Sequence, residues 1–290
     1  MRQRTRTLAV VTSLSAVVAL LSAPVTTQAG HDCKAGDGHS CVAEETAVKL
    51  IEAHGGWERW QAAPTVSFKH TMVAPYEPDD PWVSVEVTDN RTRCEYQEWP
   101  LDGAKIVYDG KQVWSTDWKR ANPPKFMVNL TYYFLNLPWL TQDDGVKLEA
   151  PGQGKLPNDG KNYDTLRMTF AGGVGETPDD YYVIYIDPDT GMMRGVEYVV
   201  TYGALLDLMG LPADMTSFGP LYKVFEEYTD VGGLKVPAAY RTFSADGNVY
   251  GEHKVEDFSF SRSFEDKWLE KPEGAVVDNS SAKRKTEAID

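Results

Sequence analysis

Residues 122–140 read NPPKFMVNLTYYFLNLPWL, and this stretch decides how the rest of the chain is arranged. Its only charged residue is Lys125. The apolar residues within 126–130 point in nearly all directions on a helical wheel, and a helix that is apolar all round is usually enclosed on every side. Pro123–Pro124 suits a helix start, and the step Leu137-Pro138 predicts its end. The stretch is too short for a membrane span, which needs about 20 apolar residues.

The flanking sequence has the period of β-strands instead. From Pro64 onward apolar and polar residues alternate, and turn dipeptides such as Asp109-Gly110 separate the runs, which is typical of half-buried antiparallel strands. We count roughly ten to twelve such runs in one meander, and a sheet of that size must curl or split. The sequence therefore predicts a mainly β (α+β) fold. One curved antiparallel sheet forms an unclosed half-barrel, and residues 122–140 form an apolar plug helix.

Two further segments interrupt the strand pattern. Residues 42–62 predict an N-terminal helix, because Leu50 and its apolar neighbours recur at helical spacing until Gly55–Gly56 breaks the pattern. His54 beside these glycines is expected to cap the helix end by hydrogen-bonding its free carbonyls. A second apolar interruption, residues 203–220, predicts a short helix or a lid-like loop.

The chain begins with the features of a secretory signal peptide. Residues 1–29 combine three arginines, an apolar run of about 14 residues and small residues before Gly30. The leader holds three of the 29 basic residues and none of the 43 acidic ones, so the remaining 261 residues carry a net charge of −17. This acidity argues against nucleic acid and anionic lipid surfaces as partners, because both need Lys/Arg clusters. We expect an exported protein of a bacterial periplasm or exterior.

The sequence thus divides into four parts. They are the signal peptide (1–29), a Cys/His-containing loop (30–41), the half-barrel domain (42–270) and a polar C-terminal tail (271–290). We expect the tail to be frayed. Cys94 lies in a strand pattern and is predicted to be buried and free.

The N-terminal loop reads GHDCKAGDGHSC and contains two His-x-Cys units. In an exported protein this spacing favours a disulfide between Cys33 and Cys41 that closes a short loop. A zinc or copper site that also uses His31 and His39 remains an alternative, as does a terminus without a function.

Three stretches carry a resemblance to a known family. They are residues 51–72 (a helix, a double glycine and a first strand), residues 108–117 with the apolar helix after them, and residues 228–261. Together with the strand order they cover most of residues 42–262. The pattern resembles the superfamily of bacterial periplasmic lipoprotein carriers and receptors, the LolA/LolB type, in its broad outer-membrane lipoprotein-sorting-like branch. The resemblance implies an unclosed half-barrel covered by helices, with a cavity for acyl chains or for a lipoprotein that carries them.

Such a cavity would have an apolar, aromatic lining with few polar anchors. The candidate ligand-binding residues come from the two apolar interruptions and are Phe126, Met127, Leu130, Tyr133, Phe134, Leu137, Leu205, Leu208 and Met209. The same side chains could instead fill the barrel as an ordinary core. In that case the protein would be an envelope interaction or scaffold protein.

Catalytic motifs are scarce in this sequence. It has no G-x-S-x-G elbow and no H-E-x-x-H metal motif. A secreted hydrolase that combines loop carboxylates with His54, His70 or His253 is the remaining enzymatic alternative. We predict a non-enzymatic monomer that binds a hydrophobic small molecule or acyl chain and needs no cofactor or metal.

Overall fold

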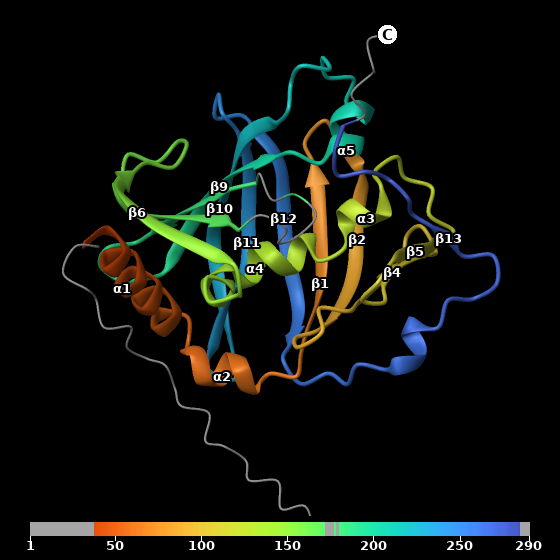
Figure 1. The fold of residues 1–290 in the computed structure, drawn as a ribbon, viewed down its shortest axis with the longest axis horizontal. Coiled ribbons are helices and arrows are strands. Elements are labelled where there is room, and N and C mark those ends of the chain that lie inside the picture. The colour runs from red at the N-terminus through yellow and green to blue at the C-terminus, as the bar shows by residue number, and fades with distance from the viewer. Residues whose placement is uncertain (1–37, 172–176, 178–179, 285–290) are drawn as a thin grey trace, which may run out of the picture.

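A computed structural model describes residues 38–171, 177 and 180–284 (Figure 1). Over these residues one antiparallel sheet holds thirteen strands, in the spatial order β13-β5-β4-β3-β2-β1-β12-β11-β10-β9-β8-β7-β6. The strands are β1 Thr65–Ala74, β2 Glu77–Asp89, β3 Glu95–Trp99, β4 Ala104–Tyr108, β5 Val113–Thr116, β6 Val146–Gly154, β7 Tyr163–Phe170, β8 Tyr182–Ile186, β9 Met193–Val200, β10 Phe218–Val231, β11 Leu234–Ser244, β12 Val249–Ser259 and β13 Val276–Val277. The predicted mainly β, unclosed antiparallel sheet is confirmed.

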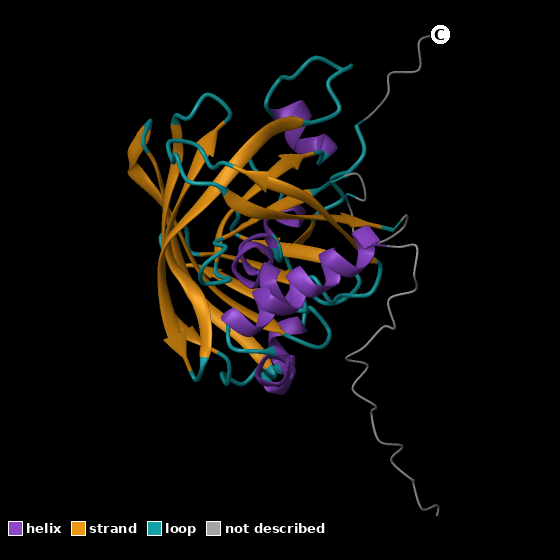
Figure 2. Cartoon of the chain, turned by 90° about the vertical axis from the view of Figure 1, so that its left-hand side faces the viewer, coloured by secondary structure: helices purple, strands orange, loops and turns teal. Residues whose placement is uncertain are grey.

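The helices lie on the concave side of this curved sheet (Figure 2). They are α1 Gly38–Ala53, α2 Trp57–Ala62, α3 Pro124–Met127, α4 Leu130–Leu140 and α5 Gly203–Leu208. A short 3-10 helix at Asp266–Leu269 packs on the other face, where Trp268 stacks on Tyr96. No helix in the described part of the chain is long and apolar enough to cross a membrane.

The strands form two meanders, whereas the sequence predicted one. Strands β1–β5 form the first and β6–β12 the second, and the pairing of β1 with β12 joins them in the middle of the sheet. This pairing puts β5 and β6 near opposite edges. The chain between them, residues 117–145, therefore crosses the concave face, and α3 and α4 are that crossing (Figure 1).

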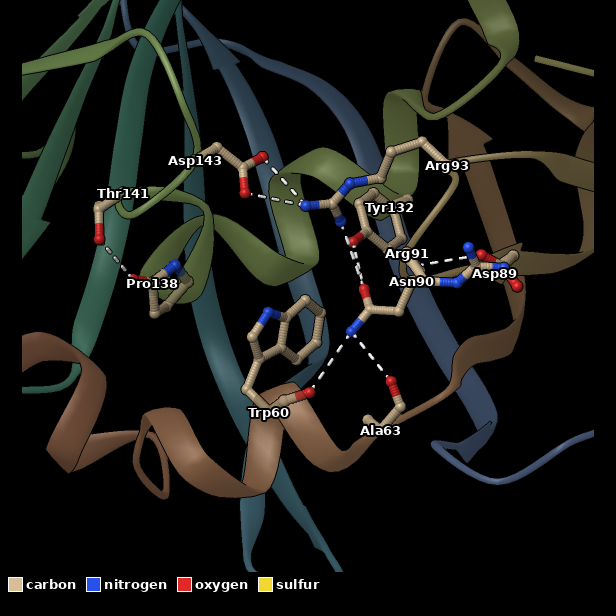
Figure 3. A network of polar contacts seen from close by, with 10 residues as sticks. All are labelled: Trp60, Ala63, Asp89, Asn90, Arg91, Arg93, Tyr132, Pro138, Thr141 and Asp143. Atoms are coloured by element: carbon tan, nitrogen blue, oxygen red, sulfur yellow. Dashed lines mark hydrogen bonds and ion pairs between the residues drawn. The ribbon is translucent and has the colours of Figure 1, made fainter. Parts of the chain in front are cut away.

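The crossing segment differs from the single predicted helix in two ways. It breaks at Asn129, whose φ of 57° is left-handed, so α3 and α4 are separate. It also continues through Pro138 to Leu140 instead of ending there. The last turn survives the missing N–H of the proline because the Thr141 N–H donates to the Leu137 carbonyl at 3.2 Å. The Thr141 hydroxyl also donates to the Pro138 carbonyl at 2.8 Å (Figure 3).

A buried carboxylate fixes the break between α3 and α4. Glu95 on β3 accepts hydrogen bonds from the Asn129 N–H (2.5 Å), the Gln97 amide (3.0 Å) and the Thr88 hydroxyl (3.2 Å). Glu86 on β2 is also buried and is a hydrogen-bond partner of Glu95. Burial and the adjacent Glu95 charge raise the pKa of Glu86 well above its usual value. Burial also raises the pKa of Glu95, to about 7, so the two carboxyls hold a proton between them near neutral pH.

A second polar network holds α4 against the β2–β3 turn (Figure 3). The Tyr132 hydroxyl donates to the Asn90 side-chain oxygen at 2.6 Å, and the Asn90 amide donates to the Ala63 carbonyl at 3.2 Å. The Arg93 guanidinium donates to both Asp143 oxygens at 2.9 and 3.1 Å. The helix is thus tied to the β2–β3 turn along one side.

The core lies where the second half of α4 meets α1 and α2. Trp139 stacks on Trp60 with ring centroids 4.6 Å apart. His54 is buried beside Trp139, and its Nδ1 lies 2.8 Å from the Leu50 carbonyl in the last turn of α1. The predicted role of His54 as a helix cap is confirmed. Burial lowers its pKa to about 4, so the imidazole is neutral and Nδ1 donates the bond.

The chain end is more ordered than predicted. Val276–Val277 pairs with β5 as β13, and the Ala282 carbonyl accepts a hydrogen bond of 2.7 Å from the Gly203 N–H. The Arg284 guanidinium bonds Asp207 on α5 at 2.8 Å. Backbone pairing and this ion pair hold residues 276–284 on the domain, so the expected fraying is wrong there.

The cysteines are only partly placed. Cys94 is buried with a free thiol, as predicted. Cys33 and His31 lie outside the described residues, as do residues 1–29. The Cys33–Cys41 disulfide and the signal peptide therefore stay predictions.

Gly55 provides a test of the packing between α1 and the β10–β11 turn. Its φ is +112°, and a Cβ atom there would lie 2.0 Å from the Gly233 carbonyl oxygen. We expect Gly55→Ala to lower the free energy of unfolding by roughly 3 kcal/mol or more, through strain and overpacking. Gly232→Ala is the matched control, because φ is +64° but nothing lies within 4 Å, and it should cost about 1 kcal/mol. Equal losses in urea denaturation would contradict this.

The Glu86 proton predicts a pH dependence of stability. The folded state keeps a proton that the unfolded state releases above its usual pKa of 4.5, so the Glu86 contribution is lost as pH rises. Glu86→Gln cannot titrate. Its free energy of unfolding relative to the parent should therefore rise between pH 5 and 8, by up to about 1.4 kcal/mol per pH unit. The pKa of Glu95 is itself raised to about 7 by burial and depends on its partner, so the difference reports the carboxyl pair. A constant difference in urea denaturation would refute a proton held by this pair.

Candidate functional site

A cavity of about 750 Å³ lies between the sheet and the α3–α4 crossing. This volume falls within the range of about 300–1,000 Å³ typical of small-molecule sites. Eight of the nine predicted ligand-binding residues line it: Phe126, Met127, Leu130, Tyr133, Phe134, Leu205, Leu208 and Met209. The interior is therefore not a completely filled core.

Leu137 is the exception among the predicted residues. It is fully buried in the main core and does not reach the cavity. The cavity meets only the first turns of α4, because the second half of the helix packs on α1 and α2 through Trp139. Our expectation that Leu137 lines a cavity is wrong for this reason.

Aromatic rings from the crossing segment and from the sheet meet in the cavity wall. The sheet contributes tyrosines from β8, β9 and the residue before α5, which sequence reasoning did not select. The ring pairs, with centroid distances, are Phe126–Tyr202 (5.5 Å), Tyr133–Tyr182 (5.7 Å) and Phe134–Tyr198 (4.6 Å). Such rings offer broad apolar contact to a ligand.

Exposed apolar side chains line the cavity on the α5 side. Leu208 and Met209 at the end of α5 are 49% and 38% exposed, and Tyr76 in the β1–β2 turn is 62% exposed. The predicted short helix of the second interruption is confirmed as α5, which sits at the upper end of the sheet in Figure 1. Its action as a lid stays a prediction.

A row of polar side chains crosses the sheet at the cavity floor. The Lys223 Nζ on β10 donates to the Thr242 hydroxyl on β11 at 3.2 Å. That hydroxyl lies 2.9 Å from His253 Nε2 on β12, and His253 Nδ1 lies 3.0 Å from His70 Nε2 on β1. The Tyr240 hydroxyl also reaches His70 Nε2, at 3.2 Å. All five side chains line the cavity.

The members of this row are joined end to end by hydrogen bonds. A lysine ammonium can only donate, so the Thr242 oxygen accepts from Lys223 and keeps its own hydrogen and a second lone pair for His253 Nε2. Beyond His253, the His70 Nδ1 lies 3.5 Å from the Thr131 hydroxyl on α4. Thr131 is in turn a hydrogen-bond partner of Glu86. The row thus links the cavity floor to the buried carboxyl pair.

Both histidines in the row are neutral. Burial, and then the Lys223 charge, lower the pKa of His70 to about 3. The same two causes, with His70 added, lower the pKa of His253 well below its usual value. Neutral imidazoles carry one donor and one acceptor each, so each can bond a neighbour on either side of it in the row.

Lys223 is a buried amine without a counter-ion. Its side chain is 7% exposed, and no carboxylate of the described residues lies within the 4 Å of an ion pair. Its Nζ instead lies 4.6 Å from the Phe134 ring centre, 5.1 Å from Tyr240 and 5.6 Å from Tyr198. Desolvation lowers its pKa to about 7.

The structure brings together two of the three histidines of the hydrolase alternative. His70 and His253 meet, but His54 caps α1 elsewhere. Within the described chain, the two imidazoles bond each other and hydroxyl groups, and neither bonds a carboxylate. Among these same residues no group of three His, Cys, Asp or Glu side chains is placed to hold a metal ion.

One feature of the sequence does indicate the polar floor, although our predictions did not include it. Leu221 and Phe225 flank Lys223 at the i−2 and i+2 positions, and both are buried. Lys223 therefore occupies an inward position in an alternating strand. A charged residue at such a position is rare unless it has a partner or a function.

Comparison with known proteins finds related folds at low sequence identity. No family model and no curated protein matches the chain. Among solved structures, a LolA superfamily protein from Nitrosomonas europaea is 11% identical, with a TM-score of 0.49, over 80% of this chain and 98% of its own. A DUF1329 family protein from Desulfovibrio piger is 13% identical, with a TM-score of 0.49, over 80% and 97%.

A third solved structure is also similar to this chain. It is a putative outer membrane lipoprotein-sorting protein domain from Vibrio parahaemolyticus, 12% identical with a TM-score of 0.45, over 78% of this chain and 97% of that one. These values describe similarity alone and identify no ligand or activity for this chain. The chain thus has structural matches, at low sequence identity, to LolA superfamily and outer membrane lipoprotein-sorting protein domain structures.

Proposed function

We propose that the protein is an exported, non-enzymatic binder that holds a lipid-like molecule with an acyl chain in the cavity between the sheet and the α3–α4 crossing. The observation that carries the proposal is the cavity of about 750 Å³ walled by aromatic rings. A filled scaffold would not leave this volume. Exposed Leu208 and Met209 beside it offer an acyl chain an apolar approach.

The free energy of such binding would come mainly from the burial of apolar surface. Each buried methylene contributes about 0.8 kcal/mol, so ten of them contribute about 8 kcal/mol. Lost translational and rotational freedom opposes association by an estimated 4–15 kcal/mol, so further contacts with the aromatic wall are needed for tight binding. Binding would therefore depend on how many methylenes the cavity encloses, and affinity should rise with chain length until the cavity is full.

Native mass spectrometry of the protein purified from its own host tests the proposal directly. We expect a co-purifying mass of lipid size that disappears on organic extraction. A clean ligand-free mass, together with no uptake of a fluorescent fatty acid, would contradict it. The search would then turn to protein partners of an envelope scaffold.

A charge in the cavity wall should abolish binding. Leu130 at the start of α4 lines the cavity and is only partly buried, so Leu130→Asp should leave the fold intact. We expect at least a tenfold loss of fluorescent fatty acid binding, because the carboxylate must be desolvated against the acyl chain. Leu101→Asp is the matched control in the exposed β3–β4 turn and should bind as the parent does. Unchanged binding by a folded Leu130→Asp would remove the ligand from this cavity.

A further inference from the structure

We propose that the cavity takes a single-chain amphiphile with its headgroup inward, and that the headgroup is a carboxylate bound by Lys223 at the cavity floor. This inference rests on the proposed function and names the chemical class of its ligand. It follows from the placement of one buried amine in an otherwise aromatic chamber.

The first step is that Lys223 has unused hydrogen-bonding capacity. An ammonium has three N–H donors, and among the described residues Lys223 uses one, to Thr242. Three aromatic rings surround Nζ, and rings attract a cation without accepting strong hydrogen bonds. A buried charge in this state is expensive unless a partner of opposite charge arrives. A carboxylate can accept both remaining N–H groups.

The second step is that no neighbouring group neutralises Lys223. His253 and His70 face it from β12 and β1, and both are neutral. Tyr240 on β11 and Tyr198 on β9 are neutral phenols, because burial raises the pKa of each far above its usual value. α4 contributes only the Phe134 ring.

The two buried glutamates of β2 and β3 do not form an ion pair with Lys223. Burial raises the pKa of Glu86 well above its usual value and the pKa of Glu95 to about 7. Glu95 is already bonded by Asn129, Gln97 and Thr88. The cavity floor is therefore electropositive although the whole chain has a net charge of −14.

The acidic exterior is compatible with this assignment. It opposes docking on an anionic membrane, but exposed charges are screened over about 10 Å at 0.1 M salt. A charge inside the cavity is screened much less, so Lys223 acts on a molecule that has already entered. A cationic headgroup would be repelled there, and an alcohol would gain no ion pair.

The titration of Lys223 gives the inference a second readout. Its pKa is lowered to about 7 by burial, and a bound carboxylate would raise it again. The ammonium is about half present at pH 7 and predominates at lower pH, so affinity for a carboxylate is highest at the lower pH. Above pH 7 binding must take up a proton, and affinity falls by up to tenfold per pH unit. An uncharged ligand should show no such dependence.

The experiment compares dodecanoate with 1-dodecanol, two ligands with the same chain and different headgroups. Each displaces a neutral fluorescent probe from the mature protein at pH 6.5 and pH 8.5. We expect dodecanoate to bind at least tenfold more tightly than dodecanol at pH 6.5, and to lose most of that advantage at pH 8.5. Lys223→Met should bind both ligands alike at both pH values. It should fold, because an apolar side chain of similar length replaces an unpaired buried charge.

The control is Lys254→Met on β12, whose ammonium pairs with Glu256 on the exposed face and does not line the cavity. It should keep the parent's preference and pH dependence. Equal binding of both ligands by the parent would overturn the inference and leave the proposed function standing. A preference for dodecanoate that survives in Lys223→Met would overturn it in the same way. Binding of neither ligand would overturn both proposals.

Discussion

The pairing of β1 with β12 is the constraint on which the rest of this structure depends. It places β5 and β6 near opposite edges of the sheet, so the chain between them must cross the concave face. A chain crossing an apolar interior needs partners for every backbone N–H and C=O, and a helix supplies them itself. Between Pro124 and Leu140 the crossing is helical except around Asn129, and there the sheet provides the Glu95 carboxylate as acceptor. The cavity is the space that this crossing leaves above the floor.

The same sheet face carries two kinds of environment. Under the second half of α4 it is a close-packed core centred on the stacked Trp60 and Trp139 rings. Under the first half it is a row of hydroxyls, imidazoles and one amine, which continues through Thr131 to the Glu86–Glu95 pair. Apolar residues of similar volume usually give equal or greater stability than buried polar groups. Stability alone therefore does not call for the polar floor, which is consistent with its assignment to ligand recognition.

Local patterns predicted most of the secondary structure. Two-residue alternation and turn dipeptides found twelve of the described strands, and the all-round apolar stretch identified the enclosed helix. The order of the strands was not predictable in this way, because the β1–β12 pairing joins residues such as Ser67 and Ser259. The helical wheel showed that residues 122–140 are enclosed but not which half faces a cavity, so Leu137 was misplaced. The helix end predicted at Pro138 was wrong, because the Leu137-Pro138 step does not reveal the hydrogen bonds that Thr141 makes.

The two-meander topology also has a consequence for the order of folding. Hairpins within β1–β5 and within β6–β12 close short loops, and such contacts form quickly. The β1–β12 pair closes a loop of about 190 residues. The conformational entropy lost on closing this loop opposes the pairing before the β1–β12 hydrogen bonds form. Until β1 pairs with β12, each half of the sheet has one long unpaired edge strand, β1 in one half and β12 in the other. An unpaired edge strand can pair with a strand of another chain. Here the two strands exposed in this way are the ones that later pair at the centre of the finished sheet.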